Sequence, residues 1–351
     1  MEGLIVDGPR RVATHDDLAG VARAALGAGH RLTGVSRLRG GSKKGVYRLI
    51  FDDDSTAIVY IWDDAEDYWS AARIDEDDAE DHANPFSHAS GIDLFVAAHT
   101  RLETLGIRTP RIHSADRSRS HYPADIAVVE DVPGATLEAL LQQDPDGAQV
   151  PLSRLADALG AMQRHQGPGF GKVALIDDGG ISQGHSCERI VLDRALDDLA
   201  EAASRDTRIE SGRDRLEDMV RGLAAAVRPR SEYGLIHGEL GPDHVLVDRY
   251  GHPVLIDIEG LMFFDVEWEH AFLRLRFGEH YRWLRRSGLD EQRLAFYTLA
   301  THLSLVAGPL RLLDGDFPDR DAMMGIAEHN LQQALAFLPG PAGPPRAILG
   351  R

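Results

Sequence analysis

The chain of 351 residues contains one cysteine, Cys187. A single cysteine excludes an internal disulfide and a zinc site built on paired cysteines. No apolar run reaches the length that spans a bilayer, and no charged-then-apolar leader is visible. Basic residues are scarce, since 38 Lys and Arg stand against 56 Asp and Glu, and this net charge of −18 argues against nonspecific nucleic-acid binding. We therefore expect a cytoplasmic protein with no nucleic-acid or membrane partner.

The first third of the sequence has the pattern of an antiparallel sheet. A helix is expected over 16–26, and apolar strands then alternate with the Gly-rich turn "RGGSKKG" and the acidic turn "DDDS" as far as Trp62. Residues 63–92 follow as an acidic insertion that includes "DEDDAEDH". This insertion is either a solvated surface segment or an acidic lid that attracts a cationic substrate.

The remainder of the sequence is mostly helical. After a helix over 93–106 and a buried strand over 124–134, the spacing of apolar residues predicts helices over 136–143, 153–166, 195–227, 266–286, 291–306 and 320–337. We expect an α+β protein of two lobes, with an N-terminal lobe over 1–131 and a helical C-terminal lobe over 132–351. A cleft between two such lobes is a usual binding place for a nucleotide or another small ligand.

Acidic and histidine side chains crowd one loop of the helical half, "HGELGPDHVLVD", which lies between two short apolar strands. Phosphoryl transfer requires a carboxylate to position or deprotonate the attacking hydroxyl, and ligands for a metal ion. Glu239 is our candidate for that carboxylate, and His244 is expected to face the same site. We expect His237 to brace the loop or to assist the chemistry.

Two further acids follow the next short strand, "VLIDIEG". Asp257 comes directly after apolar residues, so a rigid strand end would hold it as a Mg²⁺ ligand. Glu259 lies two residues later and would point to the same side if the segment is extended. Imidazole suits Mn²⁺ or Zn²⁺ better than Mg²⁺, so His244 would assist the metal or contact phosphate.

These motifs resemble the catalytic and metal loops of the aminoglycoside phosphotransferase and choline kinase-like branch of the protein-kinase fold. The Gly-rich turn, "LETLGIRTPRI", "VVEDVPG" and the two loops occur in the order of that family, so the similarity extends over most of the chain. The resemblance implies a Glu where the catalytic Asp is usual (Glu239), a His where a metal-binding Asn is usual (His244), and a retained metal ligand at Asp257. It also implies that the hinge from Glu130 to Val132 binds the adenine edge.

The resemblance further implies a phosphate-binding Lys on the third strand, but that strand, "TAIVYIW", has none. The Glu that would pair with it is expected near Phe95, so we predict an apolar contact of Tyr60 or Trp62 with Phe95 in place of the ion pair. The Gly-rich turn carries two lysines, and we hypothesise that one of them supplies the missing charge. The residues expected to cover the phosphates are Gly40, Gly41, Ser42, Lys43 and Lys44.

The segment "FFDVEWEHAFLRLRF" that follows the metal loop is a second candidate region. Asp265 is the residue in it that we expect to contact the substrate or the core. Glu267, His270 and Arg274 could share one helical face as a substrate wall, although a core-facing aromatic stripe with a charged outer side is the more usual reading of such a pattern.

These observations predict transfer of the γ-phosphoryl group of ATP (or GTP) to a hydroxyl of a small molecule, with Mg²⁺ (or Mn²⁺). The acceptor would be an aminoglycoside-like antibiotic or a metabolite. Three alternatives stay open at this point. They are a kinase-like subunit that phosphorylates peptide Ser/Thr with a partner protein, a pseudokinase that binds nucleotide or a partner without turnover, and nucleotidyl transfer on the same scaffold.

Overall fold

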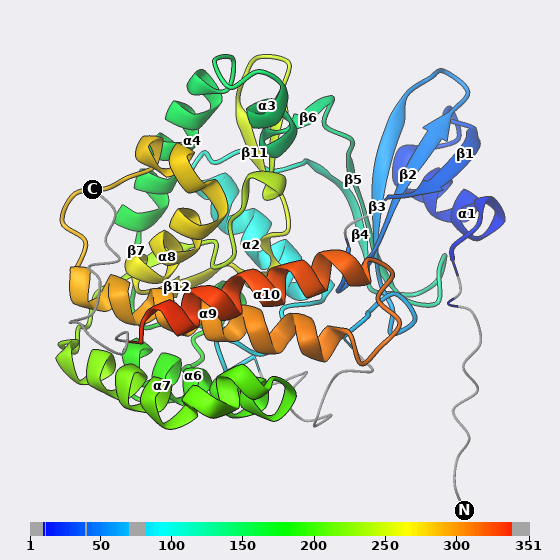
Figure 1. Ribbon diagram of the computed structural model, residues 1–351. Helices are drawn as coiled ribbons and strands as arrows, with labels where there is room; N and C mark the ends of the chain where they lie inside the picture. The colour runs from blue at the N-terminus through cyan, green and yellow to red at the C-terminus, as the bar shows by residue number, and fades with distance from the viewer. Residues whose placement is uncertain (1–9, 11, 39–40, 70–81, 339–351) are drawn as a thin grey trace, which may run out of the picture.

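The computed structural model describes residues 10, 12–38, 41–69 and 82–338. Its N-terminal part is a five-stranded antiparallel sheet of order β1-β2-β3-β5-β4 (Figure 1). The strands are β1 (Leu32–Arg37), β2 (Gly45–Phe51), β3 (Thr56–Trp62), β4 (Ile112–Asp116) and β5 (Asp125–Glu130). In the described part of the chain, no helix is both long and apolar enough to cross a membrane.

Both faces of this sheet are covered by helices, which explains the almost continuous apolar run of β3. Successive side chains of a strand point to opposite faces. Val59 and Ile61 pack with α1 (His15–Leu26), whereas Ile58 and Tyr60 pack with α2 (Ile92–Thr104). Helix α1 begins with a capping box, in which the side chain of Thr14 and that of Asp17 each accept a hydrogen bond from the other residue's backbone N–H.

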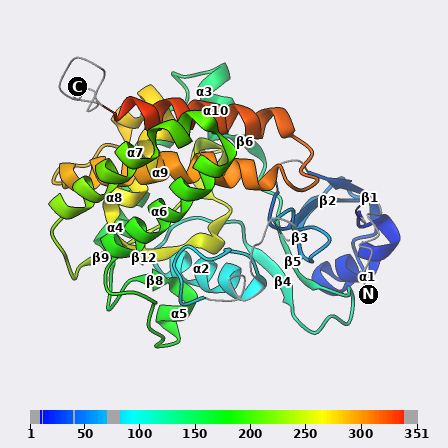
Figure 2. The same cartoon turned by 60° about the horizontal axis from the view of Figure 1, so that its bottom comes forward.

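The C-terminal part is built around α9, which packs against α6, α7, α8 and α10 (Figures 1 and 2). Apolar residues on several sides of α9 are fully buried, as expected for a central helix. The helices of this part are α3 (Leu137–Gln143), α4 (Gln149–Arg164), α5 (Val173–Asp177), α6 (Cys187–Arg205), α7 (Thr207–Ala226), α8 (Val266–Phe277), α9 (Glu291–Leu312) and α10 (Arg320–Ala336).

Two small antiparallel sheets hold the candidate catalytic and metal loops. One has the order β11-β10-β6 and the other the order β7-β9-β12-β8. Their strands are β6 (Gly134–Thr136), β7 (Gln166–Gly167), β8 (Gly171–Lys172), β9 (Tyr233–Ile236), β10 (Val245–Asp248), β11 (Pro253–Leu255) and β12 (Met262–Phe264). The catalytic loop joins β9 to β10, and the metal loop joins β11 to β12. Each loop therefore connects the two sheets and is held at both ends.

The structure confirms the mixed fold, with a sheet-rich first part and a helix-rich second part. The region expected to be helical over 195–227 is helical, and it consists of two helices, α6 and α7, that meet at Asp206. The side chain of Asp206 accepts a hydrogen bond from the N–H of Arg208 (2.8 Å) and so starts α7. Of the helix expected over 266–286, the α-helical part ends at Phe277, where Gly278 has a positive φ of 51°, and residues 278–283 continue as a 3-10 helix. We propose that Asp131 is the last residue of the N-terminal lobe.

Candidate active site

Side chains of α8 hold the catalytic loop (residues 237–244) through hydrogen bonds to its backbone. One carboxylate oxygen of Glu269, Oε2, accepts hydrogen bonds from the backbone N–H groups of His237 (2.5 Å) and Gly238 (3.1 Å). The indole N–H of Trp268 donates to the carbonyl of Gly238 (3.2 Å). Three side-chain contacts from one helix therefore fix the backbone directly before Glu239. Sequence reasoning missed Glu269 and Trp268, and the only signal for Glu269 was an acid in the middle of an aromatic helix.

Glu269 is a carboxyl group in an apolar environment. It is fully buried, and burial raises the pKa of this carboxyl to about 7, although hydrogen bonds from the loop backbone oppose the shift. Its second oxygen, Oε1, has no hydrogen-bond partner among the described residues. The carboxyl group that holds the catalytic loop therefore gains or loses its proton near neutral pH.

Glu239 lies at the surface of this loop, where a substrate can reach it. Its side chain is 57% exposed, and a carboxylate oxygen is 3.8 Å from Nζ of Lys43. The positive charge of Lys43 lowers the pKa of Glu239, so the carboxylate is ionised at neutral pH. The structure thus leaves the carboxylate of Glu239 exposed and places Lys43 of the Gly-rich turn beside it.

The two histidines of the loop stack on one another, with ring centroids 5.9 Å apart. His237 is 1% exposed, and burial lowers its pKa to about 4, so its ring is neutral. Its Nε2–H donates to the carbonyl of Ile256 (3.0 Å), which ties the catalytic loop to the metal loop. The expected bracing role fits this geometry. A direct catalytic role for His237 does not, because a buried ring cannot meet the substrate.

His244 orients its ring through the backbone of the same loop. Because the carbonyl of Glu239 can only accept, the Nδ1 of His244 at 3.0 Å must carry the proton. In the neutral ring, Nε2 then presents a lone pair, and this atom is 3.7 Å from Oδ2 of Asp257. The two predicted metal ligands therefore converge.

Asp257 has a strained backbone. Its φ of 58° and ψ of 46° lie in the left-handed region, which a non-glycine residue adopts at a cost of roughly 1–3 kcal/mol. Nζ of Lys44 is 2.8 Å from its Oδ1. Burial alone would raise the pKa of Asp257, but the charge of Lys44 lowers it. The carboxylate is consequently ionised, with one oxygen on the lysine and the other turned to His244.

Lys44 also binds Glu259, with Nζ 2.5 Å from Oε1. Residues Ile258–Gly260 form a short 3-10 helix, so the expectation of an extended segment is wrong. Asp257 and Glu259 nevertheless reach the same ammonium group. Lys44 is only 6% exposed, and these two carboxylates raise its pKa well above the ordinary value in spite of burial. A buried ammonium needs such partners, because an unpaired charge there would be strongly destabilising.

The donors present fit a divalent cation in part. Asp257 Oδ2 and His244 Nε2 face each other, and phosphate oxygens of a nucleotide would supply the hard ligands that Mg²⁺ or Mn²⁺ prefers. Glu259 does not fit as a ligand while its oxygen is on Lys44. Within the described residues, no group of three or more His, Cys, Asp or Glu side chains is arranged to hold a metal ion.

The Gly-rich turn is described from residue 41, so Gly40 lies outside the described residues. Gly41 packs closely against the backbone of Lys44, because a Cβ at position 41 would lie 2.6 Å from the carbonyl oxygen of Lys44. The Ser42 hydroxyl accepts a hydrogen bond from the indole N–H of Trp69 (3.1 Å). Trp69 belongs to the insertion, so this segment contributes directly to the shape of the turn.

The apolar replacement for the strand lysine is confirmed. The ring of Phe95 lies 5.4 Å from that of Tyr60, edge to face, and 5.6 Å from that of Trp62. Nζ of Lys44 lies 5.2 Å from the centre of the Tyr60 ring, within the range of a cation–π contact. The lysine from the turn therefore enters the space between the sheet and the metal loop.

The expected hinge lies at the end of β5. Glu130 forms an ion pair with Arg108 (2.8 Å), and its backbone N–H donates to the carbonyl of Arg111 (2.9 Å). Val132 is buried. Glu130 thus joins the hinge to the segment before β4, and binding of adenine by this backbone stays a prediction.

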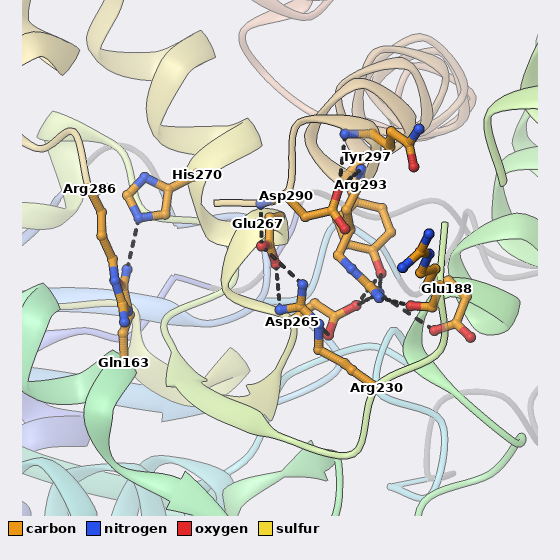
Figure 3. Close-up of polar contacts among 12 residues, drawn as sticks. Gln163, Glu188, Arg230, Asp265, Glu267, His270, Arg286, Asp290, Arg293 and Tyr297 are labelled. Carbon is orange, nitrogen blue, oxygen red and sulfur yellow. Dashed lines mark hydrogen bonds and ion pairs between the residues drawn. The ribbon is translucent and has the colours of Figure 1, made fainter. Parts of the chain in front are cut away.

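Asp265 lies in the core, which is one of the two contacts expected for it. It is 0% exposed and binds the buried Arg293 and the hydroxyl of Tyr297 (Figure 3). Arg230 lies beside it, 3.7 Å away, and also binds Glu267 (2.9 Å). The network joins the start of α8 to α9, and the buried charges of Asp265, Glu267 and Arg293 are paired with one another or with the partly exposed Arg230.

The substrate wall expected on α8 is also absent at its first two residues, because Glu267 and His270 are buried. The ring of His270 lies between the amide of Gln163 (3.2 Å) and the hydroxyl of Tyr281 (3.0 Å), and Figure 3 shows the Gln163 contact. Arg274 is partly exposed, with its guanidinium over the ring of Tyr281. Helix α8 therefore supports the catalytic loop from within the core.

The acidic insertion is partly buried where the structure describes it. Residues 70–81, which hold most of "DEDDAEDH", lie outside the described residues. On one side of this gap, Glu66 and Asp67 are buried. On the other side, the ring of Phe86 packs on Trp268 (4.8 Å between centroids), and Ser90 Oγ donates to the carbonyl of Lys43 (2.9 Å). The insertion thus contacts both α8, which holds the catalytic loop, and the Gly-rich turn.

A comparison with protein families matches residues 34–311 of this chain to the phosphotransferase enzyme family. Among solved structures, a thermostable mutant of aminoglycoside phosphotransferase APH(4)-Ia, in a ternary complex with ADP and hygromycin B, is 16% identical. The match covers 93% of this chain and 100% of that chain, with a TM-score of 0.60. No curated protein matches the sequence significantly.

Two further structures show the same fold similarity. Spectinomycin phosphotransferase APH(9)-Ia, in complex with ADP and spectinomycin, is 13% identical over 93% of this chain and 99% of that chain, with a TM-score of 0.59. The GDP complex of aminoglycoside 2′-phosphotransferase-IIIa is 17% identical over 89% and 96%, with a TM-score of 0.57. At these identities the similarity establishes the fold.

Replacement of Glu269 by Gln is expected to change the pH dependence of stability. The pKa of this carboxyl is raised from 4.5 to about 7 on folding, so the folded state binds more protons than the unfolded state between these values. Its contribution is complete below about pH 4.5 and is lost as the pH rises through 7, with a size of about 3 kcal/mol at most. Glu269→Gln should flatten the fall of Tm over this interval.

The matched control is Glu279→Gln, a substitution of a 78% exposed carboxylate just after α8. Its plot of Tm against pH should follow the wild-type plot. A Glu269→Gln plot that also follows the wild-type plot from pH 4.5 to 7 would show that Glu269 does not titrate in this range.

Proposed function

We propose that this chain, which belongs to the phosphotransferase enzyme family, transfers the γ-phosphoryl group of ATP (or GTP) to a hydroxyl of a small molecule. The observation that carries the proposal is that two neighbouring lysines of the Gly-rich turn contact both loops. Lys43 lies beside Glu239 of the catalytic loop, and Lys44 binds Asp257 of the metal loop. A positioned carboxylate, a metal-binding carboxylate and a phosphate-binding cation are the parts that phosphoryl transfer needs. The acceptor class proposed is an aminoglycoside-like antibiotic or a metabolite with a free hydroxyl.

Glu239 orients the acceptor in this proposal. The acceptor oxygen forms a bond to the γ-phosphorus while the bond from that phosphorus to the bridging oxygen breaks, and the nucleoside diphosphate leaves. The hydroxyl proton passes to the carboxylate of Glu239. Because Lys43 lowers the pKa of Glu239, the carboxylate is a weak base, and orientation of the hydroxyl is its larger contribution. A loose transition state needs little proton removal before the phosphorus–oxygen bond breaks.

Lys44 replaces the phosphate-binding lysine that the third strand lacks. Its ammonium group enters the site from the end of the Gly-rich turn, directly before β2, and it is held by Asp257 (2.8 Å) and Glu259 (2.5 Å). A divalent cation on Asp257, with His244 beside it, would neutralise charge on the phosphates. Lys44 would then keep Glu259 as its buried partner and turn its remaining N–H groups to phosphate oxygens.

Replacement of Lys44 by Met is expected to weaken nucleotide binding more than replacement of Lys43 by Met. Methionine keeps most of the side-chain volume and removes the charge in both variants. Loss of Lys44 also leaves Glu259 buried without its cation, whereas Lys43 is 3.8 Å from an exposed carboxylate. Isothermal titration with ATP and Mg²⁺ should show an affinity loss of about tenfold or more for Lys44→Met.

An affinity loss confined to Lys43→Met would contradict the assignment of the phosphate charge to Lys44. A thermal melt of each variant at the titration temperature separates loss of binding from unfolding.

Replacement of Glu239 by Gln tests the transfer step. Gln keeps the size of the side chain but removes the negative charge that orients the hydroxyl and accepts its proton, so turnover should fall by about 10²–10⁴-fold. Nucleotide affinity should stay close to that of the wild type, because Glu239 faces the acceptor side and is 57% exposed. The measurement is release of ADP from ATP, with water as the acceptor until a substrate is found.

Glu239→Asp keeps the charge and removes one methylene, so this variant tests how far the carboxylate must reach toward the acceptor. Activity that is unchanged in Glu239→Gln would remove this residue from the mechanism. Nucleotide binding in the wild type without any turnover would favour the pseudokinase alternative.

A further inference from the structure

The Gly-rich turn is held by a short segment of the insertion, residues 65–69, which we call the strap. The backbone N–H of Tyr68 donates to the carbonyl of Ser42 (2.9 Å), and the indole N–H of Trp69 donates to the hydroxyl of Ser42 (3.1 Å). Ser42 directly precedes Lys43 and Lys44. Two hydrogen bonds from the strap therefore fix the backbone that carries both lysines.

The strap is also fixed to the sheet through Glu66. This carboxylate is 3% exposed, accepts a hydrogen bond from Arg37 (2.7 Å), and binds the hydroxyl of Tyr47. Gly45, the first residue of β2, packs against it so closely that a Cβ would lie 2.6 Å from the carboxyl carbon. The strap is thus a built part of the site, with a buried and paired charge at its base.

The other side of the strap contacts the helical part of the protein. The ring of Tyr68 lies 5.3 Å from the ring of Phe317, edge to face, and the guanidinium of Arg10 covers it at 4.1 Å. Arg10 also forms a two-pronged ion pair with Asp316 (2.6 Å for each bond) and donates to the carbonyl of Ala65 (2.8 Å).

Asp316 and Phe317 belong to the corner between α9 and α10, residues 313–319. Figures 1 and 2 both show this corner beside the N-terminal part of the chain. The chain of contacts runs from this corner through Tyr68 and Trp69 to Ser42 and the two lysines.

We propose that Tyr68 and Trp69 are positioning residues for the phosphate-binding lysines, and that the α9–α10 corner sets their position through Phe317 and Asp316. The inference rests on the proposed function, because it assigns nucleotide binding to the turn. A turn joined only to its own strands would be free to move with the sheet. This turn is joined to both parts of the protein, so a change at the corner is transmitted to Lys43 and Lys44.

The test measures two properties in Trp69→Phe and Phe317→Ala. Trp69→Phe keeps an aromatic ring next to Gly308 and removes the donor to Ser42, and Phe317→Ala removes the ring that contacts Tyr68. Each substitution should weaken ATP binding by about fivefold or more in calorimetric titration with Mg²⁺. The double variant should lose far less than the product of the two effects, because both act on one chain of contacts. KM for ATP should rise more than kcat falls.

Amide hydrogen exchange of a peptide covering residues 41–47 gives the second readout, and it needs no nucleotide. Exchange there should be faster in both variants. Asp316→Asn, a milder change at the corner, should act in the same direction if Phe317→Ala unfolds the protein. The control is Glu328→Gln on α10, which breaks an exposed ion pair with Arg208 (2.7 Å) away from the strap and should change neither property.

Unchanged exchange at 41–47 in both Phe317→Ala and Asp316→Asn would overturn the inference, whatever the affinity for ATP. A wild-type protein that binds no ATP, but whose turn exchanges faster in these variants, would instead refute the proposed function and leave the coupling established.

Discussion

The ion pairs of Lys44 with Asp257 and Glu259 are the interaction on which the rest of the site depends. They join the Gly-rich turn to the metal loop, so the sheet and the helical part meet through charge as well as through packing. A buried ammonium requires these carboxylates, and Asp257 in turn keeps a left-handed backbone that brings its oxygens to the lysine and to His244. The geometry of the site therefore follows from one lysine placed in the Gly-rich turn, directly before β2.

The third strand, β3, has no lysine, whereas Lys44 lies in the Gly-rich turn. Without a lysine, β3 has an apolar inner face, and Tyr60 and Trp62 pack on Phe95 of α2. The charge pair that the resemblance implies for this position is lost as a whole, so no single buried charge remains. Lys44 reaches the same region from the turn, over the ring of Tyr60. In the proposed function, Lys44 supplies from the turn the phosphate-binding charge that the third strand lacks.

Much of this could be predicted from the sequence, because local patterns decide it. The strand and helix order follows from apolar spacing, and the contact with Phe95 follows from the missing lysine. The choice of Lys44 over Lys43 could not be predicted, because neighbours in a turn point in different directions that only the fold determines. The sequence left substrate and core open as the contact of Asp265, because its partner, Arg293, lies 28 residues away on α9. Glu269 was missed because its partners are backbone groups, which leave no signal in a sequence.

The supports of the catalytic loop are as specific as the residues they hold. Glu269 and Trp268 fix the backbone before Glu239, and Trp69 of the insertion donates a hydrogen bond to Ser42 of the Gly-rich turn.

The most direct test of the central claim is a crystal structure with a nonhydrolysable ATP analogue and Mg²⁺. The account predicts Nζ of Lys44 at hydrogen-bond distance from a phosphate oxygen, with Glu259 still bound. Phosphates held by other cations, with Lys44 still on both carboxylates, would contradict it.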